Sequence, residues 1–189
     1  VVSTVGPYAL YGEPLLRACA ETGTDYGDLT GEVPWMRRMI ERYEAAARAS
    51  HARIVHCCGF DSIPSDLGVH VLEREALRRF GMPLSRVRLR VRRARGGVSG
   101  GTVASLLNVL EESGRDRTLR ALLADPYALC VGRDVPATRQ PDVTGAAEDE
   151  AFGAWVAPFV MAPINTRVVH RTNALSGWRY GRDFRYDEG

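Results

Sequence analysis

The residues best placed to do chemistry follow two predicted strands, each of which runs directly into a predicted helix. The first segment comprises Thr4, Val5, Gly6, Pro7 and Tyr8, and the second comprises Gly59, Phe60, Asp61, Ser62 and Pro64. In a parallel α/β sheet, strand ends of this kind present backbone groups to a bound nucleotide. Gly6 would let the backbone come close to a ligand, and free N–H groups at the start of a helix can hold an anion or a ribose hydroxyl.

Each segment also has a structural interpretation. The first can be an ordinary turn between a strand and a helix, and in the second Ser62 or Asp61 can simply cap the following helix. Two aspartates and two serines lie within residues 61–66, which is more than one cap needs, so both interpretations of the second segment stay open. A carboxylate at Asp61 could accept a hydrogen bond from a ribose or an amide, or orient a proton.

Alternating arginines at residues 86–92 offer a second kind of site. The strict alternation of Arg with Val or Leu predicts a half-buried strand with an arginine face, either antiparallel or at the edge of a sheet. This face is either solvated or an electropositive patch for an acidic carrier or a CoA phosphate. Nucleic acid fits poorly, because no aromatic residues interleave with the arginines.

The glycine-rich run at residues 96–101 is not a dinucleotide fingerprint, because Val98 stands where the second glycine of GxGxxG should be. It is either a tight turn or, with Arg93 and Arg95, a nest for a phosphate. The four histidines show no HExxH spacing and the four cysteines show no CxxC spacing. The sequence therefore indicates no metal site.

Composition narrows the class of protein. The 189 residues are 45% hydrophobic and 25% charged, as in a folded globular chain. The 25 basic and 23 acidic residues leave a formal charge of +2, so no global field favours nucleic acid or an anionic membrane. Every basic residue is arginine, which excludes a Schiff base, a Walker lysine and a lysine general base within these residues. The cysteines stand in apolar contexts, which predicts buried free thiols in a reducing compartment such as the cytoplasm.

The order of predicted elements favours an α/β fold. Strands at residues 1–5, 25–29 and 52–58 alternate with helices at residues 13–21 and 33–50, which is the pattern of βαβ units in a parallel sheet. The last of these strands is apolar enough to be buried. The chain opens on a strand with no initiator Met and no signal peptide, which predicts that it starts within a fold.

From residue 65 onward the predicted organisation changes to α+β. Helices are predicted at residues 65–80, 102–111, 117–124 and 165–175, residues 132–150 as a surface excursion, and the aromatic tail as an edge strand. The longest apolar stretch, residues 154–164, is about half of the roughly 20 residues that span a bilayer, so no transmembrane helix is predicted.

Several segments together resemble one family. GPYALYGEPLLRACAETGTDYGDLTGE at residues 6–32, GFDSIPSDLG at residues 59–68 and GGTVAS at residues 100–105 resemble the saccharopine dehydrogenase-like oxidoreductases. PFVMAPINTRVVHRT at residues 158–172 and YGRDFRY at residues 180–186 are similar to the bacterial branch that contains the trans-acting enoyl reductases.

The resemblance implies an NADP(H)-type Rossmann domain, with NAD(H) as the alternative cofactor, whose glycine-rich first βα unit lies upstream of residue 1. Residues 1–63 would be the C-terminal part of this Rossmann-type parallel sheet, and residues 64–189 the start of an α+β substrate domain. The resemblance places the segment at residues 4–8 beside the cofactor and the segment at residues 59–64 near its nicotinamide end, with Asp61 as the catalytic residue. Family members are longer, so the end at Gly189 is predicted to be a truncation.

The absence of lysine separates this chain from the saccharopine dehydrogenases proper, which use lysine and histidine in acid-base roles, so their amino-acid substrate does not carry over. The enoyl reductase branch implies reduction of a carbon-carbon double bond in an acyl-lipid or polyketide intermediate presented by a synthase or an acyl carrier. Peripheral membrane contact is compatible with this substrate, and no oligomeric state is predicted. Two alternatives stay open, a reductase of a small amino or keto acid and a non-catalytic lipid-associated interaction protein.

Overall fold

The computed structural model describes residues 1–93 and 116–189, which fall into two compact units. The described part of the first unit comprises residues 1–60 and 116–131, and that of the second comprises residues 61–93 and 132–189. Arg95, the glycine-rich run and the helix predicted at residues 102–111 lie outside the described residues.

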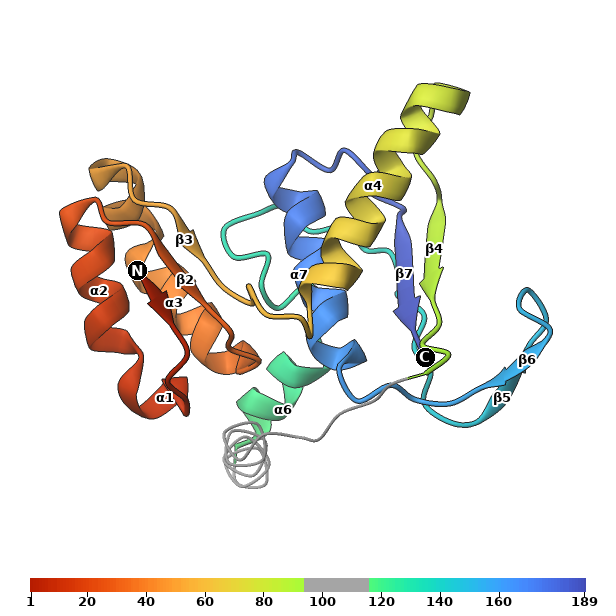
Figure 1. Cartoon of the computed structure of the whole chain (residues 1–189), viewed down its shortest axis with the longest axis horizontal. Coiled ribbons are helices and arrows are strands. Elements are labelled where there is room, and N and C mark those ends of the chain that lie inside the picture. The colour runs from red at the N-terminus through yellow and green to blue at the C-terminus, as the bar shows by residue number, and fades with distance from the viewer. Residues whose placement is uncertain (94–115) are drawn as a thin grey trace. The chain divides into compact units, whose positions relative to one another are not determined.

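The first unit is a parallel α/β arrangement (Figure 1). Its strands β1 (Val2–Ser3), β2 (Tyr26–Asp28) and β3 (Ile54–Val55) pair in parallel in the order β1-β2-β3. Its helices are α1 (Tyr8–Tyr11), α2 (Glu13–Thr22), α3 (Val33–Ser50) and α6 (Arg117–Ala124). The predicted α/β class with a parallel sheet is therefore confirmed.

The helices α2 and α3 keep almost the predicted bounds because their ends are encoded locally. Pro14 and Pro34 lie in the first turns, where a missing N–H removes no helical hydrogen bond. α2 ends at Gly23, whose φ of 75° lies in the left-handed region that glycine adopts without strain. α3 ends in the same conformation at His51, whose φ is 63°.

One face of the three-stranded sheet is covered. Tyr26 and Asp28 of β2 are buried on this face. Trp35 of α3 packs edge-on against the ring of His56, with 5.3 Å between the ring centroids. α2 and α3 pack against each other, and their most buried side chains are Leu16, Ala20, Trp35, Met36 and Met39. This side of the sheet therefore forms the apolar core of the first unit.

The opposite face of the sheet is open. The parallel register places Val2, Gly27 and Val55 side by side, and Val2 and Val55 are 75% and 51% exposed. The prediction of a buried strand over residues 52–58 is therefore wrong, since only Ile54 and Val55 pair and Val55 faces outward. An apolar run predicts burial on both faces of a sheet, and among the described residues only one face is covered.

The second unit packs two helices beside a two-stranded parallel sheet. Its elements are α4 (Ile63–Phe80), β4 (Arg86–Leu89), β5 (Ala147–Asp149), β6 (Ala154–Val156), α7 (Ala162–Leu175) and β7 (Arg185–Glu188). β4 pairs in parallel with β7, and β5 pairs antiparallel with β6. The core is formed by Val69, Val87, Val169, Tyr180, Phe184 and Tyr186. α7 contacts both α4 and β7, so it lies at the centre of this unit.

The arginine strand and the C-terminal tail meet in the second unit. The strand predicted at residues 86–92 is present over Arg86–Leu89 as β4. It lies at the edge of its two-stranded sheet, which is one of the two predicted alternatives, and it is parallel to its partner. The tail forms the predicted strand as β7, although Tyr186 within it is fully buried. No helix within residues 1–93 and 116–189 combines the length and the apolar character needed to cross a membrane.

Candidate functional site

The ends of β1, β2 and β3 bring residues of the two predicted segments to one edge of the sheet. Leu29, directly after β2, lies between them. Its main-chain N–H donates to the hydroxyl of Tyr8 at 3.2 Å. Its side chain lies against Gly59, where an added Cβ atom would come within 3.3 Å of Leu29 Cδ2. Parallel strands end at the same edge, so the start of the second segment lies beside the end of the first.

Tyr8 and Glu32 support this edge of the sheet through buried hydrogen bonds. The Tyr8 side chain is buried, its hydroxyl donates to the carbonyl of Ser3 at 2.9 Å, and burial raises its pKa. The main-chain N–H groups of Tyr8 and Ala9 donate to the two carboxylate oxygens of Glu32, each at 2.8 Å. These two donors are therefore occupied by Glu32 and do not face a ligand.

Asp28 organises the strand ends beneath the edge. Its side chain is fully buried, and its Oδ1 accepts from the N–H groups of Thr30 and Cys57, each at 3.1 Å. Its Oδ2 lies 2.7 Å from Nδ1 of His56. A carboxylate oxygen accepts hydrogen bonds, so this pairing favours the His56 tautomer that carries its proton on Nδ1.

Two neighbouring cysteines at this edge differ in environment. Cys57 is buried, and its thiol donates to the carbonyl of Thr30 at 3.0 Å. Cys58 is exposed, so the prediction that all the thiols are buried is wrong for this residue. Desolvation and the nearby Asp28 raise the pKa of the Cys58 thiol, which keeps it a weak nucleophile at neutral pH.

The outer rim of the edge is uncharged. Thr4 is exposed, Gly6 is half-buried, and Val5 and Phe60 are 63% and 88% exposed. A rim of small and apolar groups offers contact area to a flat, uncharged ring but no positive charge to a phosphate.

Asp61, Ser62 and Pro64 belong to the second unit, where they lead into α4. Asp61 is exposed and stands before the N-cap residue, which is Ser62. The Ser62 side chain is buried but makes no capping hydrogen bond to the described part of the chain, so side-chain capping by Ser62 is wrong. Pro64 lies in the first turn, where proline is favoured.

A buried amide holds the segment that contains Asp61. Asn165 of α7 is fully buried, and its Nδ2 lies 2.9 Å from the carbonyl of Asp61, 3.2 Å from Ser65 Oγ and 3.0 Å from Glu188 Oε2. Glu188 also accepts from the hydroxyl of Tyr186 at 2.5 Å, and burial with this carboxylate raises the pKa of Tyr186. Asn165 lies within the segment at residues 158–172 that carries the family resemblance, but no motif in the sequence assigned a role to Asn165 or Glu188, because their partners are brought together only by the tertiary fold.

Burial shifts the pKa of other titratable groups of this unit in the direction that favours their neutral forms. It raises the pKa of Asp66, which accepts from the hydroxyl of Thr172 at 3.0 Å. Burial, with a smaller contribution from Arg167, lowers the pKa of His170 to about 4. These groups lie between the packed helices and act as part of the core.

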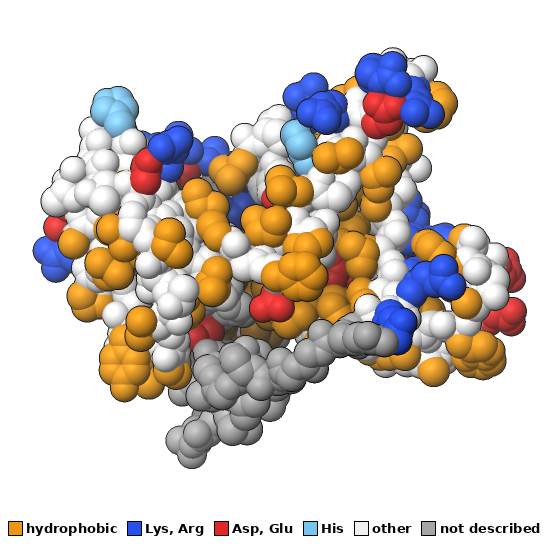
Figure 2. All heavy atoms as spheres, in the orientation of Figure 1, with side chains coloured by type: hydrophobic (Ala, Val, Ile, Leu, Met, Phe, Trp, Pro, Cys, Tyr) orange, Lys and Arg blue, Asp and Glu red, His pale blue; other side chains and the backbone are white. Residues whose placement is uncertain are grey.

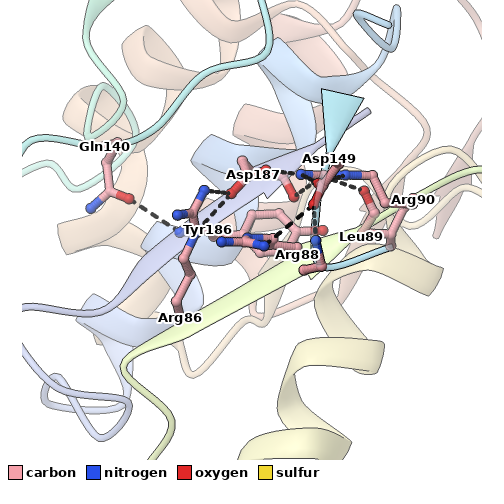
Figure 3. A network of polar contacts seen from close by, with 9 residues as sticks. Arg86, Arg88, Leu89, Arg90, Gln140, Asp149, Tyr186 and Asp187 are labelled. Carbon is pink, nitrogen blue, oxygen red and sulfur yellow. Dashed lines mark hydrogen bonds and ion pairs between the residues drawn. The ribbon is translucent and has the colours of Figure 1, made fainter. Parts of the chain in front are cut away.

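The arginine face of β4 is ion-paired (Figure 3). Asp187 of β7 lies 2.7 Å from Arg86 and 2.6 Å from Arg90, and Asp149 of β5 lies 2.7 Å from Arg90 and 3.4 Å from Arg88. The Arg90 side chain is only 10% exposed. The electropositive patch is therefore wrong for Arg86, Arg88 and Arg90, whose charges are paired. Full solvation is wrong for Arg90, while Arg86 and Arg88 keep 36% and 32% of their side chains exposed and Arg92 is exposed.

An open pocket of about 630 Å³ lies beside this network and is lined by Arg86, Arg88, Glu148, Asp149, Glu150, Ala151 and Val156. Its three acidic residues outnumber its two arginines, so it offers an anion no net attraction. Across residues 1–93 and 116–189, His, Cys, Asp and Glu side chains form no group of three or more that could hold a metal ion.

The fold and the edge define an α/β chain whose parallel strands end at one uncharged rim. One relative is a Mycobacterium tuberculosis protein that is provisionally named as a trans-acting enoyl reductase. It is 48% identical to this chain over 194 residues, which cover 100% of this chain and 46% of that protein. Proteins named trans-acting enoyl reductase from Mycobacterium bovis and Mycobacterium leprae are 44% and 43% identical over 195 residues, 100% of this chain and 47% of their own lengths. The chain spans about half the length of these curated relatives. No protein-family model and no solved structure matches it.

Proposed function

We propose that this chain is part of a nicotinamide-dependent oxidoreductase that reduces a carbon-carbon double bond in an acyl-lipid or polyketide intermediate. The observation that carries the proposal is the 43–48% identity, along the whole chain, to proteins named as trans-acting enoyl reductases. The uncharged rim at the carboxyl ends of parallel strands supports it, because ligands of open α/β sheets bind at this edge.

In this proposal residues 1–63 are the C-terminal part of a Rossmann-type domain, and residues 64–189 are part of an α+β substrate domain of the saccharopine dehydrogenase-like type. The parallel order β1-β2-β3 supports the first assignment. The open face at Val2 and Val55 supports it too, since doubly wound sheets are covered by helices on both faces.

The cofactor is NADP(H), with NAD(H) as the alternative, and it supplies a hydride when bound. Thr4, Val5, Gly6 and Pro7 from the first segment and Gly59 and Phe60 from the second would hold its nicotinamide half. Tyr8 supports this rim from within. Because Glu32 occupies the N–H groups of Tyr8 and Ala9, the phosphates would be held by residues other than these. The rim is therefore suited to the nicotinamide half of the dinucleotide and not to its phosphates.

Asp61 is the proposed catalytic residue. Its carboxylate is exposed, and its main chain is fixed by Asn165. In this position it would accept a hydrogen bond from the ribose or the amide, or hold the proton that completes the reduction. Ser62 and Pro64 would set the turn that presents it.

The substrate would be presented in the cytoplasm by a separate synthase or by an acyl carrier. The test uses the natural full-length chain that contains this sequence, NADPH or NADH, and an enoyl thioester, with the saturated thioester as the control that cannot be reduced. We expect cofactor oxidation that requires the double bond, and the saturated product in mass spectra. Reduction of a small keto acid instead would favour the amino or keto acid alternative, and lipid binding without turnover would favour the non-catalytic one.

A further inference from the structure

The exposed side of α4 carries an apolar stripe. Ile63, Leu67 and Val71 recur every four residues and so lie along one side of the helix, with Leu72 next to them. They are 36%, 52%, 51% and 50% exposed, in that order. Apart from its chain neighbours and the adjacent backbone of α4, no atom of the described residues lies within 4 Å of an added Cβ at Gly68, so the middle of this stripe is open to close approach.

The stripe ends in a basic cluster at the last turns of α4. Arg78 and Arg79 both pair with Glu75, at 2.7 Å in the case of Arg78. Arg74 forms no ion pair with any described residue. The cluster thus holds three arginines, of which two share the carboxylate of Glu75. Figure 2 shows hydrophobic side chains along α4 and arginines gathered at its far end.

This side of α4 is not needed for packing within the described second unit. α4 buries its other side through Ser65, Val69, Glu73 and Ala76. The exposed side therefore has the character of a binding surface, with apolar contact area next to a positive charge.

Charge distinguishes this surface from the open face of the three-stranded sheet. That face presents Val2, Gly27 and Val55 in register and suits an apolar cover from helices of the same domain. The α4 surface instead suits a partner that places apolar side chains beside carboxylates. The arginine face of β4 cannot serve such a partner, because Asp149 and Asp187 already neutralise it.

We propose that the exposed side of α4 docks an acidic carrier domain that presents the enoyl chain. Ile63, Leu67 and Val71 would contact apolar side chains of the carrier, and the arginines would contact its carboxylates. The stripe begins two residues after Asp61, so a carrier lying along α4 would deliver its chain close to the proposed catalytic residue. This inference rests on the proposed function and names its partner.

The test compares two substrates on the natural full-length chain, the same enoyl group on a free thioester and on an isolated acyl carrier domain of a polyketide synthase from the same organism. The variant Arg74→Glu/Arg79→Glu reverses the cluster. The matched control is Arg17→Glu/Arg48→Glu, because Arg17 and Arg48 are exposed helical arginines and each pairs with a glutamate four residues away, as Arg79 does. A second variant, Leu67→Ser/Val71→Ser, removes apolar area from the stripe.

We expect both α4 variants to lower kcat/KM for the carrier-bound chain about tenfold or more, with the free thioester and the melting temperature unchanged. The charge variant should also flatten the dependence of carrier turnover on salt, since exposed charges are screened. The control variant should behave as the unaltered chain does on both substrates.

Equal carrier turnover in the α4 variants and the control would overturn the docking proposal and leave the proposed function standing. If the α4 variants lose turnover on both substrates, or if both melt at a lower temperature, the rest of the protein covers this side of α4. Either result would also overturn the docking proposal. If the unaltered chain reduces neither substrate, the proposed function fails. Direct titration of the carrier domain then decides the docking proposal, which fails if the α4 variants bind the carrier as the control does.

Discussion

The carboxylate of Asp28 lies 2.7 Å from Nδ1 of His56, and through this contact one buried side chain joins the ends of β2 and β3. Asp28 also accepts from the N–H of Cys57, the residue that follows His56. The backbone that leads to Gly59 and Phe60 is therefore fixed from beneath. A candidate ligand edge built in this way is rigid at its base, although its rim is exposed.

The variant Asp28→Asn tests this contact through the tautomer of His56. An amide can keep one acceptor for the N–H groups of Thr30 and Cys57, but it then turns its NH2 group toward Nδ1. We expect the imidazole proton to move from Nδ1 to Nε2, which ¹⁵N chemical shifts of the ring report. An unchanged tautomer would show that Asp28 does not set the protonation of His56.

Glu32 is predicted to be a stabilising residue. The variant Glu32→Ala leaves the N–H groups of Tyr8 and Ala9 without the acceptor that each has in the structure. We expect the free energy of unfolding to fall by about 2 kcal/mol or more, from the usual cost of buried unpaired donors. The control Glu21→Ala removes an exposed ion pair with Arg17 and should cost less than about 0.5 kcal/mol. Equal losses in urea denaturation would contradict the assignment.

The helices α2, α3 and α6 of the first unit could be predicted because their ends are local, whereas the single turn α1 was not predicted. The bounds predicted for α3 and α6 are those of the structure, and α2 differs by one residue at its end, where Gly23 adopts the left-handed conformation. The strands were harder, since pairing depends on partners elsewhere in the chain. The strand predicted over residues 52–58 pairs only at Ile54 and Val55, because the neighbouring strand β2 is itself short.

The site could be predicted only in part. That residues 4–8 and 59–60 meet at one edge follows from the rule that parallel strands end together. The same rule, applied to Asp28 and His56, would have found their contact, since each stands at or next to the end of its strand. Asn165 and the Asp187 that neutralises the arginine strand lie about 100 residues from their partners, and no local pattern encodes such contacts.

His170 is predicted to make the second unit sensitive to acid. Burial lowers its pKa from 6.5 to about 4, so the unfolded chain takes up a proton at higher pH than the folded chain does. Its neutral form thus contributes stability that is fully present above pH 6.5 and is lost as the pH falls toward 4. The shift corresponds to about 3 kcal/mol. We expect His170→Gln to remove this part of the pH dependence in denaturant titrations, and a parallel decline in both proteins would refute the assignment.

Asp187 is predicted to be structural within the arginine network. The variant Asp187→Asn removes the charge that faces Arg86 and Arg90, and Arg90 is too buried for water to compensate fully. We expect a loss of about 3 kcal/mol, as for other broken buried pairs. In the control Asp134→Asn the pair with Arg182 is exposed, so the loss should stay below about 0.5 kcal/mol. Thermal melts of both variants provide the comparison.

The role of Asp61 decides whether the second segment is catalytic. In the structure its carboxylate is separate from the helix cap, so the variant Asp61→Asn tests catalysis without removing a cap. The N-cap position belongs to Ser62, and Asp61 is held through its main-chain carbonyl by Asn165, with its carboxylate exposed. Asp61→Asn keeps that carbonyl, so the melting temperature should stay near normal, as for other exposed substitutions. If the carboxylate positions a proton or a ribose, turnover of the enoyl thioester should fall at least about tenfold.

Asn165→Ala is the companion variant, because it releases the Asp61 carbonyl and also strips a donor from Ser65 and Glu188 in the core. We expect it to lower stability and turnover together, whereas Asp61→Asn lowers turnover alone. Steady-state kinetics and melting curves on the same preparations separate the two effects. Normal turnover with a lowered melting temperature in Asp61→Asn would reverse the assignment, making Asp61 a structural residue and leaving the proton to another group or to solvent.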